Sequence, residues 1–280
     1  MSDARAALRS ALRGPRMLVA PFVYDGLQAR LAQAAGFAAV YMTGFGTAAA
    51  RGLPDLGLLT MTEMAENVRT IARAVAIPLI CDADTGYGNA LNVMRTVACY
   101  EEAGASALHI EDQVWPKRCG FLGGKQVIPQ DEMLAKLRAA LDARRDPELV
   151  VIARTDALEP EGWDAAERRA RAYRDAGADL VFVDGIRSLD DLDTYARRLG
   201  DLPCLYNGQL APAPEIERRG FRVMIHTATL GIAYRALRDA LDELRRTGAV
   251  ASASDPRALG EMLELLGAPE ALARARAYER

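Results

Sequence analysis

Four stretches of the chain repeat one pattern, in which a helical segment stops at a glycine and an apolar segment begins within two residues. They read Ala-Gly-Phe-Ala-Ala from residue 35, Ala-Gly-Ala-Ser-Ala from 103, Ala-Gly-Ala-Asp-Leu from 176 and Arg-Gly-Phe-Arg-Val from 219. Glycine is the residue that most often ends a helix, because it adopts the left-handed conformation needed there. The pattern therefore predicts helices that alternate with buried strands.

Eight short apolar runs in this alternation are predicted to be strands: residues 18–22, 38–42, 78–81, 107–110, 149–153, 180–183, 204–206 and 221–225. The helices are expected at residues 25–35, 62–75, 91–103, 131–145, 164–176, 189–199, 214–219 and 234–246. Purely apolar strands that alternate with helices indicate a parallel sheet covered on its faces. Eight such units predict a (β/α)8 barrel. The alternative is an open doubly wound sheet, but no Gly-x-Gly-x-x-Gly follows the first strand.

The length of 280 residues suits one barrel domain, and half of the residues are hydrophobic, which is enough for a large core. We expect residues 1–250 to form the catalytic barrel and residues 251–280 to add a helical extension. Residues 1–16 are expected to form an amphipathic helix, with a transit peptide as the alternative. No run of 18 apolar residues is present, so no membrane-spanning helix is expected.

The charge and the cysteines narrow the function further. A net charge of −3 without a basic stripe argues against a nucleic-acid partner. Four cysteines, Cys81, Cys99, Cys119 and Cys204, show no Cys-x-x-Cys spacing. We therefore expect reduced thiols and a cytoplasmic protein.

Polar and charged residues follow most of the predicted strands, at the end of a barrel where catalytic groups gather. These residues are Thr43-Gly44-Phe45-Gly46, Asp82-Ala83-Asp84, Glu111-Asp112, Arg154-Thr155-Asp156, Asp184, Asn207 and His226, in strand order from the second to the eighth. Helix capping would explain one acidic strand end. Four acidic ends and an arginine that meet at one mouth predict a functional site.

A divalent metal is expected at this mouth. Asp82, Asp84 and Glu111 offer hard oxygen ligands, which suit Mg2+, with Mn2+ as an alternative. Zinc is disfavoured, because the chain has two histidines and lacks a cysteine ligand pattern. His109 lies within a predicted strand, where we expect a hydrogen-bonded core residue.

The three lysines of the chain exclude one mechanism. Lys117, Lys125 and Lys136 all lie outside the predicted strands. A Schiff-base aldolase needs a buried lysine on a barrel strand, so that chemistry is not expected.

The loop after the fourth strand contains Lys117-Arg118-Cys119-Gly120-Phe121. Two cations beside a thiol favour the reactive thiolate. Gly120, Gly123 and Gly124 would let the loop move as an active-site lid. The alternative is a solvated basic loop with an incidental cysteine.

Several of these motifs together resemble the isocitrate lyase/phosphoenolpyruvate mutase superfamily over about residues 10–250. They are Gly52-Leu53-Pro54-Asp55, Asp82-Ala83-Asp84-Thr85-Gly86-Tyr87-Gly88, His109-Ile110-Glu111-Asp112-Gln113-Val114, Lys117-Arg118-Cys119-Gly120 and Ile152-Ala153-Arg154-Thr155-Asp156-Ala157. The Lys-Arg-Cys-Gly form is similar to the lyase branch. The resemblance implies a Mg2+-dependent carbon–carbon lyase. It would cleave a small 2-hydroxy acid, similar to methylisocitrate or dimethylmalate, through an enolate to give pyruvate or glyoxylate.

The resemblance also implies residue roles. Asp84 would bind Mg2+ directly, and Asp82 and Glu111 would hold it through water. Thr43, the main-chain N–H groups of Gly44 and Phe45, and Arg154 would bind the oxo acid. Cys119 would be the acid/base on the gating loop. Asp55 near the metal and Lys117 complete the expected catalytic residues, and Gly120 and Asn207 the expected substrate-binding residues. The C-terminal helices would exchange between subunits of a homotetramer built from helix-swapped dimers.

The sequence departs from the lyase pattern at one part of the site. The departures are Phe121 where a His is usual, Asp184 where a Glu is usual, Gly208-Gln209 where Thr or Ser and often Glu follow the asparagine, and His226-Thr227 after the eighth strand. A buried anion that loses a polar partner costs about 1–3 kcal/mol. We therefore expect the oxo-acid half of the site to be kept and the other half to be rebuilt. Mutase-type phosphorus–carbon chemistry, oxaloacetate decarboxylation and a non-catalytic carboxylate-binding barrel remain alternatives.

Overall fold

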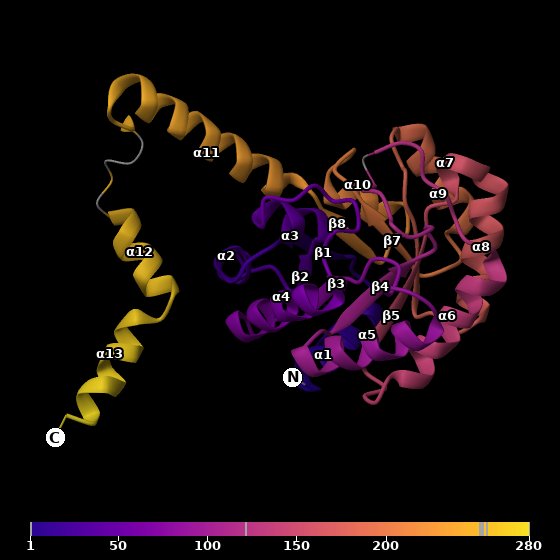
Figure 1. The fold of residues 1–280 in the computed structure, drawn as a ribbon, viewed down its shortest axis with the longest axis horizontal. Coiled ribbons are helices and arrows are strands. Elements are labelled where there is room, and N and C mark those ends of the chain that lie inside the picture. The colour runs from indigo at the N-terminus through magenta and orange to yellow at the C-terminus, as the bar shows by residue number, and fades with distance from the viewer. Residues whose placement is uncertain (1, 121, 252–254, 256, 280) are drawn as a thin grey trace.

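The computed structural model describes residues 2–120, 122–251, 255 and 257–279. Eight parallel strands close into a barrel in chain order, and β1 pairs with β8 (Figure 1). The strands are β1 (Leu18–Val23), β2 (Val40–Met42), β3 (Leu79–Asp82), β4 (Ala107–Glu111), β5 (Val150–Thr155), β6 (Leu180–Val183), β7 (Cys204–Asn207) and β8 (Val223–His226). The predicted (β/α)8 barrel is confirmed, and the open-sheet alternative is wrong.

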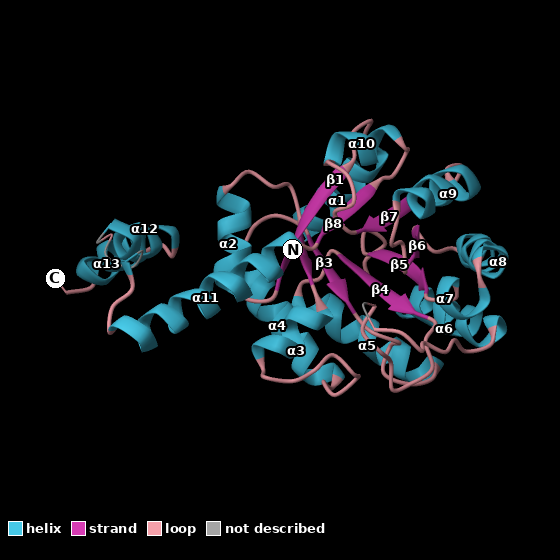
Figure 2. Ribbon diagram, turned by 90° about the horizontal axis from the view of Figure 1, so that it is seen from above, coloured by secondary structure: helices cyan, strands magenta, loops and turns pink. Residues whose placement is uncertain are grey.

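Helices surround the barrel and extend beyond it (Figure 2). They are α1 (Ser2–Arg13), α2 (Gly26–Ala34), α3 (Gly44–Ala50), α4 (Met61–Ala74), α5 (Ala90–Ala103), α6 (Gln130–Ala143), α7 (Leu158–Glu161), α8 (Trp163–Asp175), α9 (Leu189–Leu199), α10 (Ala213–Arg218), α11 (Ala228–Thr247), α12 (Arg257–Leu265) and α13 (Ala268–Ala277). Gly104 and Gly177, which were predicted to end helices, have φ values of 108° and 107°, in the left-handed region that favours glycine.

The first helix closes the N-terminal end of the barrel. Leu8 of α1 is buried in the same apolar cluster as Ile80, Ile152 and other strand residues. Arg5 Nε donates a hydrogen bond of 2.9 Å to the carbonyl of Ala105, just before β4. The expected amphipathic helix is confirmed, and it lies at the end opposite the carboxyl ends of the strands.

Several elements differ from the sequence-based expectation, and three of them, α3, β5 and α11, differ for reasons that the structure shows. The loop expected after the second strand begins as helix α3, because the Thr43 hydroxyl accepts a hydrogen bond from the main-chain N–H of Gly46 and caps the helix. Strand β5 continues to Thr155, two residues further than expected. Helix α11 starts six residues earlier than expected, and its first turn is attached to β1 by a 2.6 Å hydrogen bond from the Thr229 hydroxyl to the carbonyl of Phe22.

The C-terminal helices α11, α12 and α13 extend beyond the barrel (Figure 1), and α12 contacts α2. None of the described residues in these three helices is buried. Leu237 and Leu241 of α11 are 63% and 55% exposed. Arg30 of α2 donates a hydrogen bond of 3.0 Å to the carbonyl of Leu265 at the end of α12. The predicted extra helices are confirmed, and their apolar faces are open.

Among the described segments, no helix is both long enough and apolar enough to cross a membrane.

Candidate active site at the carboxyl end of the barrel

A cavity of about 230 Å3 lies at the carboxyl ends of the strands. It is lined by Phe22, Tyr41, Thr43, Phe45, Asp55, Asp82, Lys117, Cys119, Gly120, Arg154, Asp184, Gly185, Ile186, Arg187 and Asn207. The expected site residues Gly44, Asp84 and Glu111 do not line it. Each contacts a residue that does, as described below. The structure thus brings the strand ends and the Cys119 loop together in one place.

The turn after β3 is held by the Asp82 carboxylate. Its Oδ1 accepts a hydrogen bond of 3.0 Å from the main-chain N–H of Asp84, and its Oδ2 accepts one of 3.1 Å from that of Gly44. A Cβ atom on Gly44 would lie 2.6 Å from Asp82 Oδ2, so this position requires glycine. Asp84 has a φ of 46°, a left-handed conformation that is uncommon for residues other than glycine, although aspartate adopts it more readily than most. Such a conformation is typical of residues held in place at functional sites.

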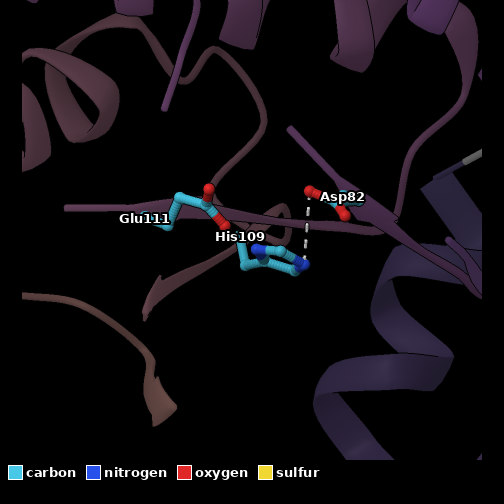
Figure 3. Close-up of side chains that lie close together, drawn as sticks. All are labelled: Asp82, His109 and Glu111. Atoms are coloured by element: carbon cyan, nitrogen blue, oxygen red, sulfur yellow. Dashed lines mark ion pairs between the residues drawn. The ribbon is translucent and has the colours of Figure 1, made fainter. Parts of the chain in front are cut away.

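Asp82, His109 and Glu111 form a buried group that could hold a metal ion (Figure 3). One ligand atom from each lies within 4.8 Å of the others. His109 Nε2 is 2.7 Å from the hydroxyl oxygen of Tyr41 and 3.6 Å from Asp82 Oδ1. Burial lowers the pKa of His109 to about 4, so its ring is neutral near pH 7. His109 is the expected hydrogen-bonded core residue, and it also lies beside two carboxylates.

Asp84 lies against the lysine of the loop. Its Oδ1 is 2.9 Å from Lys117 Nζ, which also forms an ion pair with Asp55. Burial raises the pKa of Asp84 to about 6, against the opposing effect of Lys117. Burial alone would lower the pKa of Lys117, but Asp84 and the neighbouring carboxylates raise it well above its usual value. Lys117 is therefore a cation that joins two predicted site residues.

Arg154 and Lys125 share a second buried network. Arg154 Nε and Nη2 donate hydrogen bonds of 2.8 and 2.9 Å to Asp156, and its Nη1 and Nη2 form ion pairs of 3.2 and 3.1 Å with Glu111 and Asp184. Lys125 Nζ lies 2.7 Å from a carboxylate oxygen of both Asp156 and Asp184. Lys125 was not among the residues predicted for the site.

The scarcity of lysine in the sequence is a signal that could have pointed to Lys125 as a site residue. All three lysines of the chain are buried, each 4% exposed, and none lies on a strand. Lys136 donates to the carbonyl of Thr85 at 3.2 Å. Arginine supplies the rest of the positive charge of the chain. Each of the three lysines contacts a specific partner in the interior of the protein.

The donor set fits a divalent cation. The two networks contain six carboxylates, Asp55, Asp82, Asp84, Glu111, Asp156 and Asp184, against three cations, Lys117, Lys125 and Arg154. Burial raises the pKa of Glu111 well above its usual value, which marks the cost of this negative charge. Carboxylate oxygens are the ligands that Mg2+ prefers. A divalent ion among Asp82, Glu111 and their neighbours would offset that cost.

The loop after β4 lies over the cavity. The main-chain N–H of Cys119 donates a hydrogen bond of 3.1 Å to the carbonyl of Asp55, and the Cys119 side chain is buried. A Cβ atom on Gly120 would lie 2.6 Å from Asp184 Oδ2. Gln113 joins the loop to the strand, because its Nε2 donates to both Glu111 Oε1 and the Arg118 carbonyl at 3.0 Å. The loop is therefore seated on the site.

A larger hollow of about 700 Å3 lies beside the same loop, lined by Trp115, Arg118, Leu122 and neighbouring residues. None of the strand-end carboxylates lines it, so the smaller cavity is the candidate active site.

The departure from the lyase pattern at Gly208 has a structural cause. This residue has a φ of 149°, and a Cβ atom on it would lie 2.4 Å from the Tyr206 hydroxyl oxygen. A threonine or serine therefore does not fit beside Tyr206. Asn207 Nδ2 is 3.4 Å from Asp184 Oδ1, which places both residues at the cavity. Phe121 lies outside the described residues.

The chain thus combines a closed parallel barrel with buried carboxylates that could bind a metal and a cysteine-containing loop, all at the carboxyl ends of the strands. This combination is typical of metal-dependent (β/α)8-barrel enzymes. A sequence model described as phosphoenolpyruvate phosphomutase matches residues 8–245. The chain belongs to the phosphoenolpyruvate mutase/isocitrate lyase superfamily.

Two curated relatives are lyases. The chain is 42% identical over 254 residues to a probable 2-methylisocitrate lyase 2 of Corynebacterium glutamicum, covering 88% of this chain and 82% of the relative. It is 38% identical over 276 residues to the 2,3-dimethylmalate lyase of Eubacterium barkeri, covering 94% and 93%.

Two solved structures extend the comparison to hydrolases. Oxaloacetate acetylhydrolase in complex with 3,3-difluorooxalacetate is 38% identical, with a TM-score of 0.92 and coverage of 99% and 98%. Phosphonopyruvate hydrolase in complex with oxalate and Mg2+ is 33% identical, with a TM-score of 0.89 and coverage of 99% of each chain. Relatives in this superfamily thus bind small carboxylates, and one of them was solved with Mg2+.

Proposed function

We propose that this chain is a Mg2+-dependent carbon–carbon lyase that cleaves a small 2-hydroxy acid to give pyruvate or glyoxylate. One observation carries the proposal: Cys119 lines the same small cavity as Thr43, Asp82 and Arg154. A thiol positioned there can serve as the acid that a carbon–carbon cleavage needs. The similarity to two lyases agrees with this reaction class.

Asp84, Asp82 and Glu111 are the residues that we assign to the metal, with His109 beside them. When bound, Mg2+ would act as a Lewis acid that stabilises negative charge on the oxygen at C2 of the substrate. We assign the oxo-acid end to Thr43, the main-chain N–H groups of Gly44 and Phe45, and Arg154. In this assignment the guanidinium of Arg154 meets the carboxylate of the oxo acid.

The cleavage itself needs one base and one acid. Asp55, which lines the cavity and is paired with Lys117, would take the proton of the 2-hydroxyl group. The C2–C3 bond then breaks, C2 becomes the 2-oxo carbon, and the electron pair passes to C3. C3 takes its proton from the Cys119 thiol. The two groups return to their starting protonation states by exchange with water.

The second product would be more apolar than succinate. Phe121 replaces a histidine of the similar lyases, and a phenyl ring packs against an alkyl group but cannot hydrogen-bond a carboxylate. Gly208 also offers no hydroxyl group, and a larger side chain at this position would clash with Tyr206. A dimethylmalate-like substrate therefore fits this proposal better than methylisocitrate.

Phosphorus–carbon chemistry on phosphonopyruvate is the second candidate. It is favoured by the match to the phosphomutase family and by the likeness to phosphonopyruvate hydrolase. Cleavage of oxaloacetate belongs in the same comparison because of the likeness to oxaloacetate acetylhydrolase. We assign Cys119 to protonation of the carbon fragment, a step that the mutase rearrangement of phosphonopyruvate does not need, whereas the acetate released from oxaloacetate would need it as well.

We also propose that the active protein is a homo-oligomer, a tetramer of helix-swapped dimers. The exposed leucines of α11, together with Leu259, Leu263 and Leu272 of α12 and α13, support this proposal, because contiguous apolar faces mark interfaces. Sedimentation velocity should show a species larger than 30 kDa, and Leu237→Glu with Leu241→Glu should shift it toward the monomer. A monomeric wild-type protein at micromolar concentration would contradict this assembly.

The reaction class is tested by a substrate screen with Mg2+. The purified chain is incubated with 2,3-dimethylmalate, 2-methylisocitrate, oxaloacetate and phosphonopyruvate, and the 2-oxo acid is detected with coupled lactate dehydrogenase where pyruvate forms. We expect 2,3-dimethylmalate to have the highest kcat/KM. Turnover of phosphonopyruvate alone would reverse the ranking of the two candidates.

A further inference from the structure

The cations at the active-site cavity differ in how fully they are paired. Among the described residues, three cationic side chains line the cavity: Lys117, Arg154 and Arg187. Lys117 and Arg154 each contact two or more buried carboxylates. The Arg187 side chain is 60% exposed, and its carboxylate partner is Glu159 at 3.4 Å. Arg187 is therefore the cation at this cavity whose charge is least committed.

The main chain of Arg187 is fixed at the start of α9. Its N–H donates a hydrogen bond of 3.1 Å to Asp191 Oδ2. The next residue, Ser188, caps α9 in a reciprocal pair with the same aspartate. The side chain thus starts from a held position between β6 and α9, and it lines the cavity.

The balance of charges around the cavity indicates that the Arg187 guanidinium is available to bind an anionic group of the substrate. The two buried networks beside the cavity contain more carboxylates than cations, as counted above, and a divalent metal would offset two negative charges. A substrate with two carboxylates brings in two more. Arg154, assigned to the first carboxylate, is already bonded to Asp156, Glu111 and Asp184. A second carboxylate therefore needs another cation, and an arginine fork matches a carboxylate with two parallel hydrogen bonds.

We propose that Arg187 binds the carboxylate of the fragment that leaves, so that it selects substrates with two carboxylates. This inference rests on the proposed lyase function. Exchange of Glu159 for the substrate costs little, since an exposed ion pair contributes little to stability. Glu159 Oε1 also accepts a hydrogen bond of 2.7 Å from the N–H of Gly124 in the loop after β4. Glu159 thus joins the loop to Arg187.

Binding measurements separate the two ends of the site. The probes are oxalate, a two-carbon ligand for the oxo-acid end, and 3,3-difluorooxaloacetate, which carries its second carboxylate on the CF2 carbon, beyond the oxo-acid end. Calorimetry in saturating Mg2+ compares wild type with Arg187→Gln and Arg187→Lys. The matched control is Arg197→Gln, because Arg197 is an arginine of α9 that does not line the cavity and bonds to Thr194.

Arg187→Gln should weaken difluorooxaloacetate binding about 10- to 100-fold, the range for a hydrogen bond to a charged group, and change oxalate binding less than twofold. Arg187→Lys should lie between wild type and Arg187→Gln, and Arg197→Gln should match wild type. Glu159→Gln should tighten difluorooxaloacetate binding, because it releases the guanidinium. With 2,3-dimethylmalate, Arg187→Gln should raise KM by the same factor and lower kcat less.

The inference would be overturned if Arg187→Gln bound each probe with the same affinity as wild type. An equal loss of both probes would also overturn it, since Arg187 would then support the whole site rather than select the second carboxylate. If wild type cleaves none of the 2-hydroxy acids but the two probes still separate, the lyase proposal fails while the role of Arg187 stands.

Discussion

Oδ1 of Asp84 and Nζ of Lys117 lie 2.9 Å apart in a buried ion pair that connects the end of β3 to the loop after β4. Asp84 is the residue that we assign as the direct metal ligand, and Lys117 precedes Cys119 by two residues. The pair therefore joins the proposed metal site to the proposed acid. Breaking a buried pair by removing one partner leaves an uncompensated charge, which is strongly destabilising.

Asp84→Asn should remove nearly all Mg2+-dependent turnover, a loss of about 100-fold or more, because it takes away a charged oxygen ligand. Calorimetric titration with Mg2+ measures the loss of metal binding, and the dimethylmalate assay measures the loss of turnover. Asp142→Asn in α6 is the matched control, because it changes an exposed aspartate. Full wild-type activity in excess chelator would contradict the metal requirement.

Cys119→Ser should lower kcat by about 10²- to 10⁴-fold, the contribution of general acid catalysis, because a hydroxyl is a much weaker acid than a thiol. Oxalate affinity should stay nearly unchanged, since other groups hold the oxo-acid end. Cys99→Ser in α5 serves as the control thiol and should behave as wild type. Should Cys119→Ser keep full activity, the thiol is incidental and the lyase assignment fails.

Gly120→Ala should lower kcat about 10- to 100-fold by preventing the loop from seating, because its Cβ would lie 2.6 Å from Asp184 Oδ2. Gly123→Ala tests the same loop without that conflict, since its nearest contact would be Glu159 Oε1 at 3.4 Å. Stopped-flow fluorescence of Trp115, which lies in the loop, can follow closure directly. Equal rates for the two variants would show that the Gly120 contact does not govern seating of the loop.

Asp184 should contribute stability that is lost in acid. Burial raises its pKa, but Arg154 and Lys125 lower it well below the usual value. An aspartate in the unfolded chain has a pKa of about 3.9. The contribution is therefore fully present above that pH and falls as the pH drops through the unfolded value toward the folded one.

Urea unfolding between pH 6 and pH 3 tests this prediction. The free energy of unfolding of wild type should fall more steeply below about pH 4 than that of Asp184→Asn. Asp190→Asn, at an exposed position of α9, should keep the wild-type slope. Parallel curves for wild type and Asp184→Asn would show that the ion pairs of Asp184 carry no pH-dependent stability.

The barrel was predictable because its signals are local. A helix that stops at glycine before an apolar strand depends on residues adjacent in sequence, as at Gly104 and Gly177. The strand ends then followed from topology, since parallel strands bring their carboxyl ends to one edge. The strand order predicts that Asp82 and Arg154 meet, the resemblance to the superfamily adds Cys119, and all three line one cavity.

Other features depended on contacts between distant segments. Lys125 meets Asp156 and Asp184 across 31 and 59 residues of chain, which no local pattern reveals. Arg187 acquires its place only when the loop after β6 meets the cavity. Helix α3 was predicted as a loop for a different reason: its glycines, Gly44 and Gly46, disfavour a helix, although Thr43 was available as its cap.

The most direct test of the account is the ratio of kcat/KM for 2,3-dimethylmalate to that for phosphonopyruvate, measured with Mg2+ for wild type and Cys119→Ser. The account predicts that wild type favours 2,3-dimethylmalate and that Cys119→Ser loses about 10²- to 10⁴-fold on that substrate. A wild-type preference for phosphonopyruvate, unchanged in Cys119→Ser, would contradict it.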